Sequence, residues 1–192
     1  MTFAARTLGS SGVAFTAFTQ TVNFSGGSTQ LSTSVTIPTG ATNAVIEIWG
    51  SGASGAASNV GSNGGGGGAG GYSRSASINV SAGNGQTIAC LIGGNFLNNT
   101  GYATSVSTGT FSLTTQTANG GGIGGILTGG TGGTASGGSV NTSGGNGAAN
   151  ITGGTAVTGV NGGPAGVGGN GANASLSNQT AGGAGLIVIR WT

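Results

Sequence analysis

The feature that most constrains the fold of this chain is an uncharged, glycine-rich stretch from residue 119 to residue 185. Eighteen glycines lie between residues 129 and 171, and they favour a spacing of three: ten fall in one phase, seven in the next and one in the third. An α-helix repeats at about 3.6 residues and a strand at about 2, whereas polyproline-II backbone repeats at about 3. Collagen shares that period but needs abundant Pro, and this chain has 2. The spacing therefore predicts polyglycine-II helices.

Such helices make no internal hydrogen bonds, so their backbone groups need partners on neighbouring segments. Ordering Gly costs roughly 0.5–1 kcal/mol more than ordering Ala, so the 26 glycines of the stretch cost on the order of 13–26 kcal/mol. A lattice of hydrogen bonds between segments, at about 1 kcal/mol each, can offset this cost. The alternative is a loose Gly/Ser loop. Recurring apolar residues favour the lattice: Ile123, Ile126, Leu127, Ile151, Val157, Val160, Val167 and Leu176.

Charged residues are almost absent from the chain. They are Arg6, Arg74, Arg190 and Glu47, with no Lys, Asp or His. Because there is no carboxylate pair, no His and no cluster of metal ligands, the sequence predicts a protein that is not an enzyme and that holds no metal or cofactor. Cys90 lies in an apolar run and is expected to be buried and non-catalytic.

The same composition bears on partners. Three scattered Arg form no basic patch, so nucleic acid is not an expected partner. No run approaches the ~20 apolar residues of a transmembrane helix, and no continuous apolar core marks a secretory signal. We therefore expect no membrane insertion. A surface with so little charge lacks what normally keeps proteins apart in solution, which favours a place in an assembly.

Outside the glycine-rich segments the sequence predicts about eight strands and no helix. The strand-like runs are residues 13–24, 30–37, 43–49, 72–80, 86–92, 102–106, 110–114 and 186–191. This pattern is typical of an all-β, antiparallel sandwich, jelly-roll-like, from which the glycine-rich segments 50–71 and 119–185 leave and return. The last run is apolar on both faces and should lie inside a sheet, and the turns predict hairpins between 13–24 and 30–37 and between 102–106 and 110–114.

Residues 1–33 are predicted to be a strand arm, which is either an attachment segment or the first strand pair of the sandwich. Residues 34–192 are predicted to form the glycine-rich sandwich domain. Within it, Glu47 is the only acid, and it is expected to lie within about 6 Å of Arg190 or Arg74 as a structural ion pair.

Five short motifs follow one another in a specific order. They are Thr36-Ile-Pro-Thr-Gly-Ala-Thr-Asn-Ala-Val-Ile-Glu-Ile-Trp-Gly-Ser-Gly52, Gly70-Gly-Tyr-Ser73, Ala82-Gly-Asn-Gly-Gln-Thr87 before Leu91-Ile-Gly-Gly94, Tyr102-Ala-Thr-Ser105, and Ala181-Gly-Gly-Ala-Gly-Leu-Ile-Val-Ile-Arg-Trp191. In this order, residues 34–192 resemble the glycine-rich domain of bacteriophage tail-fibre, adhesin and related virion structural proteins. The resemblance implies a β-sandwich with appended polyglycine-II helices, located in the virion after assembly in the host cytoplasm.

The resemblance also implies a fibre or spike that contacts the host surface, with other virion proteins as partners and a homo-oligomer, a trimer by analogy. A host glycan or protein is then the expected target. The residues expected to contact it are Phe96, Asn98, Asn99, Thr100 and Tyr102, which supply rings, amides and a hydroxyl; the two rings could instead pack beneath their loop. Two alternatives stay open: an architectural capsid or tail component (decoration or cement) with no receptor, and, more remotely, an ice-binding protein.

Overall fold

The computed structural model describes residues 14–25, 29–57, 62–157, 159, 165–166 and 179–192. Their regular structure consists of two antiparallel sheets and one short 3-10 turn, η1 (Ser81–Gly83), with no α-helix in these ranges. This is the all-β class that the sequence predicts.

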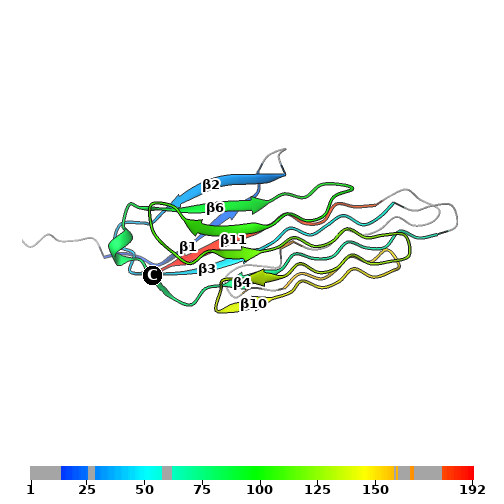
Figure 1. Cartoon of the computed structure of the whole chain (residues 1–192). Coiled ribbons are helices and arrows are strands. Elements are labelled where there is room, and N and C mark those ends of the chain that lie inside the picture. The colour runs from blue at the N-terminus through cyan, green and yellow to red at the C-terminus, as the bar shows by residue number, and fades with distance from the viewer. Residues whose placement is uncertain (1–13, 26–28, 58–61, 158, 160–164, 167–178) are drawn as a thin grey trace, which may run out of the picture.

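The first sheet has the strand order β1-β11-β3-β4-β10, and β5 also pairs with β3. Its strands are β1 (Phe18–Asn23), β3 (Asn43–Trp49), β4 (Tyr72–Arg74), β5 (Ile78–Asn79), β10 (Val140–Thr142) and β11 (Leu186–Trp191). The second sheet has the order β2-β6-β7-β8-β9. Its strands are β2 (Gln30–Thr36), β6 (Thr87–Gly93), β7 (Thr104–Thr108), β8 (Gln116–Ala118) and β9 (Ala135–Ser136). β11 lies between β1 and β3, which confirms the interior place predicted for the last run (Figure 1).

Alternate side chains of the two sheets meet in one apolar core, so the arrangement is sandwich-like. Ile46 and Ile48 project from β3, and their register partners Ile189 and Ile187 project from β11. The second sheet supplies, among others, Ile88, Cys90, Ile92 and Val106. Cys90 is buried as expected. The core thus follows from strand alternation, because every second residue of each strand reaches the same side.

The first two strands do not form the predicted hairpin. β1 pairs with β11 in the first sheet, whereas β2 pairs with β6 in the second. Val22 of β1 and Val35 of β2 reach the common core from these different sheets, so each strand buries its apolar face only by joining its own sheet. Whether residues 1–33 also serve for attachment stays a prediction, and residues 1–13 lie outside the described ranges.

The second predicted hairpin is shifted. β7 pairs with β8 at Gln116–Ala118, not with residues 110–114. In that segment the Phe111 N–H donates to the Thr87 carbonyl at the start of β6 over 3.0 Å, and within the described structure Leu113 bonds only to the side-chain hydroxyl of Thr108 in β7. The predicted strand 72–80 is also divided, into β4 and β5, and the short strands β9 and β10 within the glycine-rich stretch were not predicted.

Beyond the strands, the glycine-rich segments run side by side away from the sheets (Figure 1). Segment 50–56 shows how they are held. The N–H groups of Gly50, Ala53 and Ala56 donate to segment 65–71, those of Ser51 and Ser54 to segment 99–102, and those of Gly52 and Gly55 to segment 180–183, over 2.8–3.2 Å. Successive residues therefore bond to three different neighbours, and the pattern repeats every three residues.

Segment 65–71, which accepts bonds from segment 50–56, shows the same three-residue pattern toward its own next neighbours. Its residues Gly65, Gly68 and Gly71 donate to segment 119–125, and Gly66 and Ala69 donate to segment 145–148. The backbones approach so closely that a Cβ atom on Gly68 would overlap the carbonyl oxygen of Thr131. The described part of the glycine-rich stretch is thus an ordered hydrogen-bonded lattice and not a loose loop.

Candidate functional site

Within the described ranges, three turns close the ends of glycine-rich segments that lie away from the strands, and we call them the distal turns: residues 95–101, 123–128 and 148–152 (Figure 1). The lattice places them next to one another. Ser54 donates its N–H to the Asn99 carbonyl and accepts the Gly124 N–H at its own carbonyl. On the neighbouring segment, the N–H of Gly65 donates to Gly125 and that of Gly66 to Ala148. The distal turns are therefore one composite surface.

The residues predicted to contact the host divide into two groups in the first distal turn. Asn98, Asn99 and Thr100 are exposed. Phe96 and Tyr102 are half-buried, and their rings pack edge to face with centroids 6.3 Å apart. Phe96 also packs against Phe24 of the strand region. The amides and the hydroxyl thus reach the surface, while the two rings support the loop from beneath.

Each distal turn contains one non-glycine residue with a positive φ. These are Asn98 (φ 60°), Leu127 (φ 58°) and Ile151 (φ 56°), and no other non-glycine residue of the described chain has one. Asn tolerates this conformation, whereas for a β-branched residue such as Ile it is an outlier. Residues held this way cost of order 1–3 kcal/mol each and cluster at functional sites. The lattice on either side holds these turns in place.

Large apolar side chains are exposed on the same surface. Leu127 is 59% exposed, Leu97 51% and Ile126 46%. From the sequence alone, the second and third distal turns were not expected to form a site. The large apolar residues that stand among glycines in these two turns were visible in the sequence. Only the lattice shows that the turns lie together at one end of the molecule.

Glu47 lies on the opposite face of β3 from the core. Its Oε1 is 3.4 Å from Arg74 Nε and accepts a hydrogen bond from the Tyr72 hydroxyl over 3.2 Å. Glu47 is fully buried because a second apolar cluster, Trp49, Tyr72 and Val188, surrounds it. The structure therefore brings Glu47 to Arg74. Arg190 pairs in register with Val45, and its side chain is exposed.

The chemistry available to the described residues is limited. They include no group of three or more His, Cys, Asp or Glu that could hold a metal ion. Burial raises the pKa of the Cys90 thiol to about 11, which keeps it protonated at neutral pH.

No helix within the described ranges has the length and apolar character needed to cross a membrane. Neither the models of known protein families nor the curated proteins give a match to this chain.

Proposed function

We propose that this chain is a structural protein of a bacteriophage virion, a fibre- or spike-type appendage whose distal turns contact the host surface. The observation that carries the proposal is the strained, exposed set of distal turns at the end of a rigid hydrogen-bonded lattice. Binding residues are often found on loops that a rigid scaffold positions. The resemblance of residues 34–192 to glycine-rich virion domains points the same way.

The finer architecture belongs to the same proposal. The three-residue repeat of the hydrogen bonds supports polyglycine-II helices, since that conformation has about three residues per turn and sends its backbone groups outward. The crossing of the chain between sheets from β1 to β2 supports a jelly-roll-like sandwich. The low charge supports a place among other virion proteins in a homo-oligomer, for which a trimer is the analogy.

The host target would be a surface glycan or protein recognised without charge. The distal turns offer the amides of Asn98 and Asn99, the hydroxyl of Thr100 and the apolar side chains of Ile126 and Leu127. Such a mixture of amide and apolar groups suits neutral, hydroxyl-rich or amide-rich surfaces.

The test is adsorption of the labelled, purified chain to cells that the virion infects. The double variant Asn98→Gly/Leu127→Gly removes two contact side chains and keeps the backbone, because Gly adopts a positive φ freely. We expect at least about ten-fold weaker adsorption, the scale of one hot-spot residue. The control is Val140→Thr, which alters an apolar residue that is 43% exposed on β10, outside the distal turns.

Unchanged adsorption of the double variant would reject the distal turns as the contact surface. Antibody labelling of intact virions then decides the architectural alternative, in which neighbouring subunits cover the lattice and block the label.

A second observation favours the ice-binding alternative: Thr128, Thr131 and Thr134 are exposed and follow one another at the three-residue period of the lattice. Thermal hysteresis in a solution of the purified chain would support that reading.

A further inference from the structure

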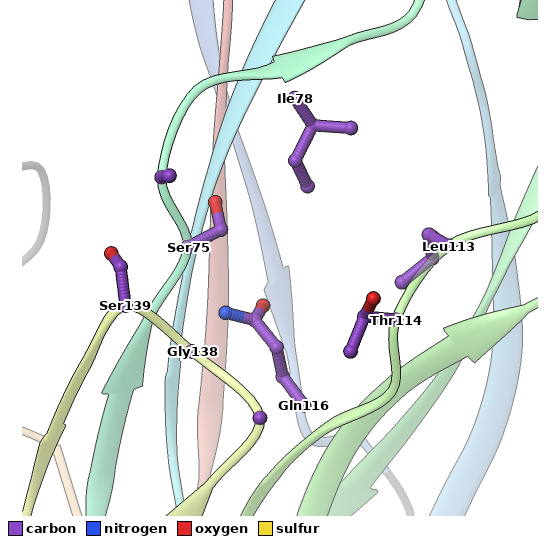
Figure 2. A pocket seen from close by; sticks show the side chains of 9 residues that line it. Ser75, Ile78, Leu113, Thr114, Gln116, Gly138 and Ser139 are labelled. Carbon is purple, nitrogen blue, oxygen red and sulfur yellow. The ribbon is translucent and has the colours of Figure 1, made fainter.

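A pocket of about 440 Å³ opens between the two sheets, and none of the residues that line it belongs to a distal turn. Figure 2 shows the side chains around it. Its lining includes Ser75 between β4 and β5, Ile78 of β5, Leu113 and Thr114 before β8, Gln116 of β8, and Ser139 of the β9–β10 connection. This volume lies within the range of small-molecule sites in proteins.

An extra residue in one strand lies at the edge of the pocket, where Ser75 and Ala76 line it. β4 and β5 both pair with β3, but between the pairs Glu47↔Arg74 and Ala44↔Ile78 the chain advances four residues against three in β3. This is the count of a β-bulge, which bends the strand and interrupts the ladder. Ser75 lies in the bulge, where its hydroxyl accepts the Ile46 N–H over 2.9 Å.

The opposite wall is the tight connection between β9 and β10. Gly137 has a φ of 83°, and a Cβ atom there would overlap the Thr115 carbonyl. The Ser139 hydroxyl donates to the Arg74 carbonyl over 3.2 Å. The connection is thus fastened to both sheets, and the pocket has a preformed wall.

Gln116 is the unusual residue of the pocket. It pairs in register with the core residue Val106 and is 2% exposed, yet neither its Nε2 nor its Oε1 has a hydrogen-bond partner in the described structure. Its side chain extends between the sheets toward Ser75 (Figure 2). A buried polar group without a partner is costly, so two such atoms at one residue call for an explanation, and a bound ligand would supply one.

The side chains that line the pocket restrict the chemical class of ligand that it can bind. No lining residue is titratable, so an uncharged ligand is favoured. The carboxamide of Gln116 presents a donor and an acceptor side by side, and two adjacent hydroxyls of one ligand can accept from the first and donate to the second. Ser75 and Ser139 add hydroxyls, while Ile78 and Leu113 offer apolar surface to C–H groups. A pyranose ring has all of these features.

We propose that this pocket binds one neutral pyranose, free or at the end of a glycan, with its vicinal hydroxyls on the Gln116 carboxamide. The proposal is independent of the host contact assigned to the distal turns. A ligand of this size at ordinary ligand efficiency should bind with a Kd on the order of 1 mM.

The experiment is a titration of the ¹⁵N-labelled chain with the methyl glycosides of glucose, galactose and mannose, followed at the Gln116 side-chain NH₂ resonance. That resonance is assigned by its loss in Gln116→Met, a variant of similar volume. A saturable shift with at least one glycoside is the expected result. No shift with any of the three, up to tens of millimolar and so well beyond the expected Kd, would overturn the proposal and leave Gln116 bonded to water alone.

Ligand-observed saturation transfer then compares variants. Gln116→Met should weaken binding at least about ten-fold, the loss that 1.4 kcal/mol produces. The matched control Gln86→Met makes the same change at a half-buried Gln outside the pocket and should bind normally. Should Gln116→Met fail to fold, Ala76→Phe adds bulk at an exposed position of the rim and should block binding. Equal binding by the wild type and a folded pocket variant would show that the sugar binds elsewhere and reject the site.

Discussion

The strand region and the glycine-rich lattice of this chain are held together by opposite means. In the sheets, side chains such as Trp191 and Ile189 fill a core and are fully buried. In the lattice, backbone groups bond to three neighbours in turn, and the buried side chains are small, such as those of Ser54 and Ala69. A side-chain core tolerates swaps between side chains of similar volume best, whereas the touching backbones of the lattice leave no room for a methyl group at glycines such as Gly68.

The two regions should therefore fail in different ways. Removing atoms should damage the sheets, and adding atoms should damage the lattice. Four substitutions test this contrast, from the largest expected effect to the smallest.

Trp191→Ala should be the most destabilising. Trp191 is fully buried in β11, and its indole N–H donates to Gln20 over 3.0 Å. We expect a loss of about 4 kcal/mol in the free energy of unfolding, measured by denaturant titration, because a large cavity replaces the ring. The control is the exposed neighbour Arg190→Ala, which should change stability by less than about 0.5 kcal/mol.

The rate at which a thiol reagent labels Cys90 is a second way to test the effect of Trp191→Ala. The thiolate is the reactive form, and burial raises the pKa of Cys90 to about 11, so the native thiol should label very slowly at pH 8. Trp191→Ala should accelerate labelling because the core opens more often. A labelling rate equal to that of the wild type would contradict the core role of Trp191.

Gly68→Ala should disrupt the lattice by adding a single methyl group. Its Cβ would overlap the Thr131 carbonyl, which is backbone and cannot rotate away. We expect a loss of about 3 kcal/mol. Gly85→Ala is the control: Gly85 has a φ of 79° but nothing within 4 Å of a Cβ, so only backbone strain of about 1 kcal/mol applies. Equal losses at both positions would refute the close-contact account of the lattice.

Glu47→Gln should cost about 1–2 kcal/mol. The amide oxygen can still accept from Tyr72, but the charge that faces Arg74 is lost. The loss is limited because the Arg74 side chain is 33% exposed and water can solvate it. A double-mutant cycle with Arg74→Met measures the coupling, and a coupling energy near zero would exclude a stabilising ion pair.

Leu127→Gly should have the smallest effect and the opposite sign. Leu127 is mostly exposed with a φ of 58°, so Gly relieves backbone strain and should stabilise the chain by up to about 1 kcal/mol. Thermal unfolding measures the change. A destabilisation of more than about 1 kcal/mol would mean that Leu127 packs against something within the lattice.

The sequence predicted the long strands well. The runs that became β3, β6 and β11 carry enough alternating or continuous apolar residues to be recognised alone. The sequence did not predict the short strands, whose formation depends on the strand beside them. β9 and β10 have two and three residues, and they exist because β8 and β4 offer them a ladder. The hairpins were wrong for the same reason, since pairing is settled between sheets and not between neighbours in the chain.

The candidate sites divide in the same way. The exposure of Asn98, Asn99 and Thr100 followed from a polar loop, whereas the other two distal turns come together only through lattice bonds. Nothing in the sequence marks Gln116, because a polar residue in a Thr-rich run looks exposed. Its register with Val106 turns it inward.

By itself the sequence determined the all-β class, the near absence of charge and the three-residue period of the glycine-rich stretch, because these depend on residue type and spacing alone. Only the tertiary structure decided which segments bond to one another, which turns share one end of the lattice, and that a buried carboxamide borders a pocket. Those features depend on contacts between residues far apart in the chain, and local pattern carries no information about them.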